Sequence, residues 1–121
     1  MANAEEAFAK LTEISGFLGA CIVDANSGMM LGSTPVVGGL DLELAAAGNT
    51  EVLRSKRKTM KSLNLTDPIE DILITLKSQY HLLRPLAAND MLFVYVALDR
   101  SKANLALARH TLAESEKNLV I

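Results

Sequence analysis

Histidine and cysteine have the broadest chemistry of the side chains in this sequence, which contains two histidines and one cysteine. His81 lies in an expected strand and His110 in an expected helix, and neither has a histidine or cysteine at metal-ligand spacing. Because a metal site needs several converging ligands, we expect both histidines to be exposed or hydrogen-bonded. Cys21 lies in an apolar segment with no cation nearby in sequence, so we expect a packed core side chain rather than a nucleophile. These residues therefore predict no enzyme active site and no cofactor.

Residues 32–39 are rich in glycine and separate an expected strand from an expected helix, which is the position of a phosphate-binding loop. Such a loop needs a lysine, which this segment lacks. Asp41 and Glu43 also place negative charge where phosphates would dock. We therefore expect a flexible connector rather than a nucleotide site.

Two groups of charged residues are candidates for binding another protein. Asp67, Glu70 and Asp71 surround Pro68, and they form either a surface for a basic partner or, as we favour, a solvated loop. The second group is a basic stripe on one face of an expected helix. Because successive residues of a helix are rotated by about 100°, its members fall within an arc of about 100° around the helix axis. Its members are Arg54, Arg57, Lys58 and Lys61. A solvent face explains this stripe, and docking of a partner is the alternative.

The composition indicates one domain, residues 1–121, that folds around an aliphatic core. Half of the residues are apolar, 21% are charged and 4% are aromatic, so apolar surface can be left over for an interface. With 14 acidic and 12 basic residues, the net charge of -2 gives no general attraction to nucleic acid. The first residues lack the features of a secretory signal, and no apolar run is long enough to insert into a membrane. We expect a cytoplasmic protein.

Residues 91–98 are eight consecutive apolar residues between Asp90 and Asp99. Such a run is typical of a strand that is buried on both faces, so we place it at the centre of a sheet. Further strands are expected at residues 18–24, 29–31, 72–77 and 80–86. Helices are expected from Asn3 to Gly16, at 40–63, and from a cap at Asp99 or Ser101 to the C-terminus. The result is an α+β fold with a five-stranded antiparallel sheet in the order α-β-β-α-β-β-β-α.

The order and spacing of these segments resemble the roadblock (dynein light chain) family, in particular small bacterial roadblock domain proteins. The matching segments are 19–24 with the turn to Gly28, 71–76, 80–85, 93–100 and 103–109. The resemblance implies a profilin-like fold with the first and third helices on one face of the sheet and the second helix on the other. It also implies a homodimer with a non-catalytic role beside a small Ras-like GTPase, in polarity, motility or transport.

Three functions can be weighed against these residues. An interaction module that binds a GTPase is favoured. A small-molecule sensor with a pocket on a profilin-like sheet is the alternative, although the chain has few aromatic residues to line a pocket. An enzyme is disfavoured because no nucleophile, base or metal group is found in the sequence.

The expected helix at 40–63 suggests how two chains could associate. Its apolar side contains two polar residues, Asn49 and Lys56, and each costs about 1 to 3 kcal/mol if it is buried without a partner. In an antiparallel pair of helices related by a two-fold axis, Asn49 of one chain can face Lys56 of the other. The alternative is that Lys56 reaches solvent past its own sheet.

The expected strand at 72–77 lies at the edge of the sheet in this topology, so it can pair with the same strand of a second chain. We therefore predict a homodimer. The predicted interface residues are Asn49, Val52, Lys56, Met60, Ile72 and Ile74.

Overall fold

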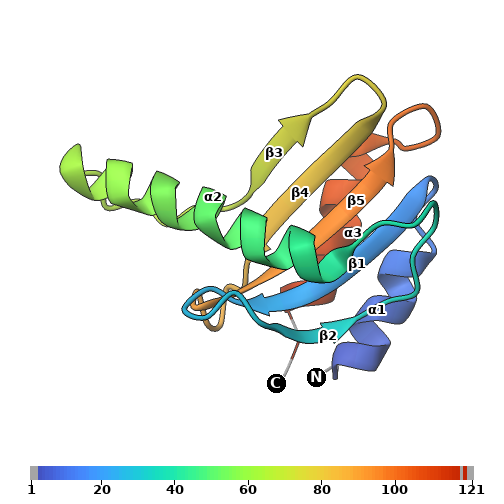
Figure 1. The fold of residues 1–121 in the computed structure, drawn as a ribbon, viewed down its shortest axis with the longest axis horizontal. Coiled ribbons are helices and arrows are strands. Elements are labelled where there is room, and N and C mark those ends of the chain that lie inside the picture. Colours follow the sequence, from blue (N-terminus) through green and yellow to red (C-terminus); the bar gives the residue numbers. More distant parts are fainter. Residues whose placement is uncertain (1–2, 118, 120–121) are drawn as a thin grey trace.

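The computed structural model describes residues 3–117 and 119. In these residues the helices and strands follow the predicted order α-β-β-α-β-β-β-α (Figure 1). The helices are α1 (Ala4–Thr12), α2 (Leu42–Ser62) and α3 (Leu105–Lys117). The strands are β1 (Phe17–Asp24), β2 (Met30–Ser33), β3 (Ile72–Thr75), β4 (Gln79–Pro85) and β5 (Leu92–Asp99).

The strands form one antiparallel sheet in the order β2-β1-β5-β4-β3. Strand β5 lies at its centre, as its continuous apolar run predicts, because Val94 pairs with Ile22 of β1 and with Arg84 of β4. Strand β3 pairs with β4 alone within the described residues, which confirms its predicted position at an edge.

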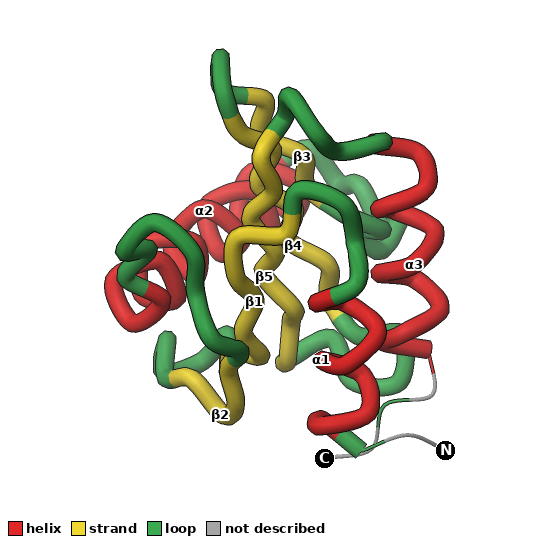
Figure 2. Tube along the Cα trace, turned by 90° about the vertical axis from the view of Figure 1, so that its right-hand side faces the viewer, coloured by secondary structure: helices red, strands yellow, loops and turns green. Residues whose placement is uncertain are grey.

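Helices cover both faces of the sheet, in the arrangement that the resemblance implies. Figure 2 shows α2 on one side of the sheet and α1 with α3 on the other. Leu11 of α1 and Leu112 of α3 pack in one apolar cluster. Leu53 of α2 packs in a second cluster on the opposite face, with Cys21 and Tyr95. The burial of the central strands on both faces follows from this arrangement.

Two helix ends differ from the sequence-based expectation. Helix α1 ends at Thr12, and the chain turns before Gly16, whose φ of +83° lies in the left-handed region. The cap predicted for α3 at Asp99 or Ser101 is wrong, because the Asp99 carboxylate accepts hydrogen bonds from Ser101 N at 2.9 Å and Ser101 Oγ at 2.7 Å. These bonds form a local turn, and the cap of α3 is Asn104, whose Oδ1 accepts from Leu107 N at 3.0 Å.

Helix α2 is longer than the part of the sheet that it covers. Its buried residues are Leu42, Ala46, Thr50 and Leu53, and none follows Leu53 in the described helix. Residues 54–62, here called the overhang, project beyond the sheet (Figure 1). No helix in residues 3–117 is long and apolar enough to cross a membrane.

Candidate protein interface

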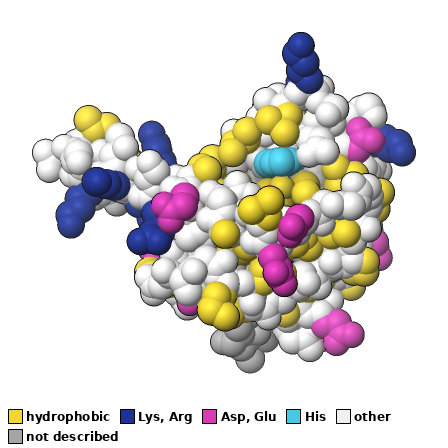
Figure 3. Space-filling model, viewed as in Figure 1, with side chains coloured by type: hydrophobic (Ala, Val, Ile, Leu, Met, Phe, Trp, Pro, Cys, Tyr) yellow, Lys and Arg dark blue, Asp and Glu magenta, His cyan; other side chains and the backbone are white. Residues whose placement is uncertain are grey.

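The predicted basic stripe lies on the overhang, and its four members are not equivalent. Lys58 and Lys61 are exposed, and exposed Arg54 contacts Glu51 at 3.4 Å within the helix. Arg57 is half-buried, and its Nη2 donates a hydrogen bond of 2.7 Å to the carbonyl oxygen of Asp90. Figure 3 shows Lys and Arg side chains gathered around this end of α2. The stripe is therefore an exposed basic surface at Arg54, Lys58 and Lys61, whereas Arg57 binds the body of the protein.

Charge is divided sharply along the chain. Residues 11–53 contain acidic side chains but no lysine or arginine, and the overhang then carries five basic residues between Arg54 and Lys61. Within α2 and its cap, Asp41, Glu43 and Glu51 lie toward the N-terminus. Each charge sign suits its end of the helix dipole. Two such helices in antiparallel contact would keep their basic ends apart.

The helix residues of the predicted dimer interface lie along one flank of α2. Asn49 and Met60 are half-buried, Lys56 is exposed, and Val52 is 38% exposed. Val52 and Lys56 line a shallow depression with Glu51, Ser55 and Thr59. This flank thus presents an apolar side chain and small residues to the outside of the single chain.

The two edges of the sheet differ in how well they can accept another strand. On β2, Ile22 pairs with Gly32 and Val23 with Met30, so Leu31 is an extra residue that forms a bulge. On β3, Ile72 and Ile74 pair with Leu83 and His81 without a register shift. Bulges hinder pairing with another edge, so β3 is the edge that is open to a further strand.

Part of the sheet face near β3 is not covered by α2. Ile74, half-buried at the edge, pairs with His81, whose ring meets Tyr95 in a T-shaped contact with centroids 5.5 Å apart. Leu76, just after β3, is 41% exposed. Figure 3 shows hydrophobic side chains over this part of the sheet. The uncovered face and the overhang are both available to a second molecule.

His81 is hydrogen-bonded, as the sequence predicts. Its Nε2 lies 2.7 Å from Oε1 of Gln79, and burial lowers its pKa from 6.5. Among the residues that the structure describes, no three His, Cys, Asp or Glu side chains are placed to hold a metal ion.

The lowered pKa of His81 predicts a contribution to the pH dependence of stability. Because the folded-state pKa lies below the ordinary value of 6.5, the unfolded chain binds more protons as the pH falls through this range. The free energy of unfolding should therefore decrease as the pH falls from above 6.5 through the folded-state pKa. Urea unfolding at a series of pH values should show a smaller decrease for His81→Gln than for the wild type. His110→Gln, at an exposed position on α3, should follow the wild type; if both variants behave alike, His81 makes no such contribution.

Cys21 is fully buried, and this burial raises the pKa of its thiol to about 12. The thiol therefore stays protonated and packs as a small apolar side chain. This confirms the predicted core position.

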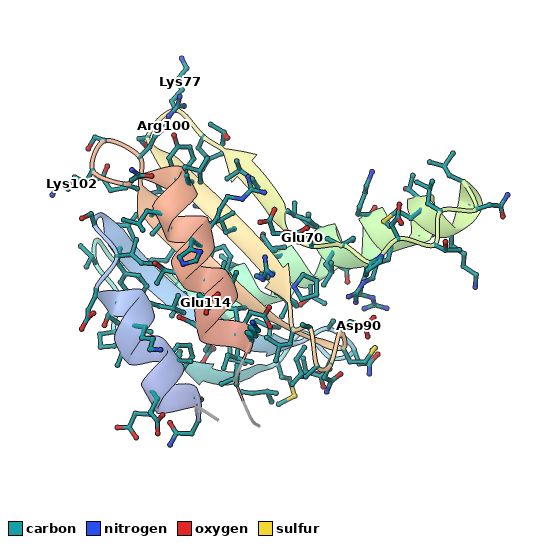
Figure 4. All side chains as sticks on the ribbon, turned by 180° about the vertical axis from the view of Figure 1, so that it is seen from behind. Glu70, Lys77, Asp90, Arg100, Lys102 and Glu114 are labelled. Atoms are coloured by element: carbon teal, nitrogen blue, oxygen red, sulfur yellow. The ribbon has the colours of Figure 1, made fainter. Side chains whose placement is uncertain are left out.

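A cleft of about 880 Å³ lies between the overhang, the loop at 65–70 and the turn that precedes β5. Glu70 and Asp90, both beside this cleft, are labelled in Figure 4. At one end of the cleft, Glu116 accepts hydrogen bonds from Arg84 Nε and from Ala87 N, both at 3.0 Å.

The predicted acidic cluster is divided in the structure. Glu70 lies beside the cleft, whereas Asp71 binds Arg109 of α3 at 2.6 and 3.0 Å.

Comparisons with known proteins identify the fold. No protein-family model matches the sequence, and the search of curated proteins gave no match. A roadblock/LC7 domain from Streptomyces avermitilis superposes with a TM-score of 0.75 at 14% identity, over 91% of this chain and 88% of that one. Myxococcus xanthus MglB gives 0.75 at 14% identity, over 88% and 83%. The gliding protein MglB from Thermus thermophilus gives 0.68 at 15% identity, over 97% and 94%. The chain has the fold of bacterial roadblock domains.

Proposed function

We propose that this chain with the roadblock fold is a homodimeric, non-catalytic interaction module that binds or regulates a small Ras-like GTPase. The similarity to MglB, which in Thermus thermophilus is called a gliding protein, supports a role in motility or a related process. The resemblance of the sequence to roadblock domains supports the GTPase as partner. In this role the chain acts as a scaffold or as a modulator of the activity of its partner.

One observation supports the homodimer above all. Helix α2 extends past the sheet that it covers, and the edge strand β3 of that sheet is open to pairing. The apolar side chain of Val52, just before the overhang, is 38% exposed, and contact with a second copy would bury it. Pairing of β3 with the β3 of the second copy would make one continuous sheet. The overhang of each chain would then lie over the uncovered face near Ile74 and His81 of the other.

The charges along α2 favour an antiparallel pair. In a parallel pair, the five basic residues of one overhang would lie beside the same five of the other and repel them. In an antiparallel pair related by a two-fold axis, the two overhangs point in opposite directions, so their basic residues are kept apart. Asn49 of one chain and Lys56 of the other would face each other in this arrangement, which is the contact proposed from the sequence.

The GTPase is proposed to dock on the exposed part of the basic stripe, at Arg54, Lys58 and Lys61. These side chains lie near the junction of the two chains, so one partner could contact both copies. Basic side chains on an exposed helix favour an acidic partner surface and speed its association.

The test is recovery of a partner by the immobilised protein from the cytoplasm of its own source, with GDP or with a non-hydrolysable GTP analogue. We expect mass spectrometry to identify a Ras-like GTPase, with different recovery in the two nucleotide states. Lys58→Glu with Lys61→Glu should lower its recovery about tenfold without dissociating the dimer. The matched control, Lys10→Glu with Lys102→Glu, reverses two exposed charges on the opposite face. Equal loss with both variants would refute the docking surface, and recovery of no GTPase would refute the partner.

A further inference from the structure

The overhang is connected to the rest of the protein by very few contacts. Most of its side chains are exposed, and only Arg57 and Met60 are half-buried. The hydroxyls of Thr59 and Ser62 donate to carbonyls of the same helix. In the part of the chain that the structure describes, the bond from Arg57 Nη2 to Asp90 O is the one side-chain hydrogen bond from the overhang to another element.

The acceptor of this bond belongs to a turn that is itself well held. Leu92 N donates to Asn89 O at 3.1 Å, and Met91 N donates to Asn89 Oδ1 at 3.1 Å. Ala25 N in turn donates to Met91 O at 2.8 Å and so joins the turn to the end of β1. The carbonyl of Asp90 is therefore a fixed point on the body of the protein. A charge-assisted hydrogen bond to a fixed acceptor constrains the helix that carries the donor.

The angle of the overhang matters because the helix behaves as a lever. Leu53 is the last buried residue of α2, and nine residues follow it at about 1.5 Å per residue, which gives a free length of about 13 Å. A rotation of about 10° about Leu53 would therefore move the tip by about 2 Å. A displacement of that size is enough to lose complementarity at a packed interface.

We propose that Arg57 is a positioning residue that fixes the angle of the overhang and so preorganises α2 for association with a second copy. This inference rests on the proposed homodimer. It assigns Arg57 a different role from Arg54, Lys58 and Lys61, whose side chains are exposed to a partner. Preorganisation strengthens association because less conformational freedom is lost on binding.

The test compares Arg57→Gln with Lys58→Gln, two variants that each remove one positive charge from adjacent positions of the same helix. Lys58 is exposed, so its loss should leave the dissociation constant of the dimer within about twofold of the wild type. Arg57→Gln should raise that constant about tenfold in sedimentation equilibrium. Arg57→Lys, which keeps a charged donor, should recover part of this loss. Equal effects of the two glutamine variants would overturn the proposal, because charge alone would then explain them.

A distance measured within one chain tests the role of Arg57 independently of whether the protein is a homodimer. Spin labels on cysteines introduced at the exposed positions Lys61 and Lys77 report the distance from the overhang to the β3–β4 hairpin. Cys21 is buried and should not react. With labelled chains diluted in unlabelled ones, Arg57→Gln should broaden the distance distribution and Lys58→Gln should not. If the wild type proves monomeric, the homodimer fails, while this readout still tests whether Arg57 fixes the angle of the overhang. An unchanged distribution in Arg57→Gln would refute that role of Arg57.

Discussion

The double variant Val52→Asp, Lys56→Glu is expected to sediment as a monomer of 13.0 kDa, whereas the wild type sediments as a dimer of about 26 kDa, twice that mass. Both residues lie on the flank of α2 that is proposed to meet the second copy, and two-fold symmetry introduces each change twice. An unpaired charge buried at an interface costs about 3 kcal/mol or more. The dissociation constant should therefore rise by at least about a hundredfold. Val52 is preferred to the half-buried Met60 because Met60 also contacts the cleft of its own chain.

The control for this variant is Leu107→Asp. Leu107 is 61% exposed on α3, on the opposite face of the sheet, so this change also places a carboxylate at an exposed apolar position. It should leave the dimer intact, and urea unfolding should show that both variants remain folded. A double variant that stays dimeric at micromolar concentration would show that α2 is not the interface. Ile74→Lys would then test whether the edge strand alone holds the dimer.

The fold was predictable because its signals are local. The run at 91–98 has no polar interruption, which indicates a strand covered on both faces, and β5 lies there between β1 and β4. Asp67 and Pro68 separate α2 from β3, and turn residues separate β3, β4 and β5, so an antiparallel order followed. The cap of α3 was missed because Asp99, Ser101 and Asn104 all have capping side chains, and only the structure shows that the first two bind each other.

The candidate interface was only partly accessible to sequence reasoning. Helical spacing placed Arg57 on the basic stripe, but its partner Asp90 lies 33 positions away, and spacing along a helix contains no information about that distance. Asp71 likewise looked like one member of an acidic loop, although its partner Arg109 is 38 positions away. Glu116 gave no signal, because one acidic residue near the end of a helix is ordinarily solvated. These contacts depend on how elements pack, which local periodicity does not specify.

The ion pair of Arg84 with Glu116 predicts the largest change in the stability of the single chain. The Arg84 side chain is 16% exposed and that of Glu116 is 2% exposed, so solvent screens neither charge well. Arg84→Leu leaves the Glu116 carboxylate buried with only the backbone N–H of Ala87 as partner. We expect the free energy of unfolding to fall by about 3 kcal/mol, the usual cost of breaking a buried ion pair from one side. Urea unfolding, followed by far-UV circular dichroism at equal chain concentrations, measures this change.

A double-mutant cycle separates two contributions to this change: the lost attraction between Arg84 and Glu116, and the cost of leaving the Glu116 carboxylate buried without its partner. Arg84→Leu combined with Glu116→Leu removes both charges, leaving Ala87 N as a donor without its partner, which costs about 1 kcal/mol. The double variant should therefore be more stable than Arg84→Leu alone, although it carries one substitution more. The exposed pair of Arg54 with Glu51 is the comparison, and Arg54→Leu there should change stability by less than about 1 kcal/mol. If the effects of Arg84→Leu and Glu116→Leu are instead additive, the two side chains do not interact in solution, and α3 is held to β4 by its apolar contacts alone.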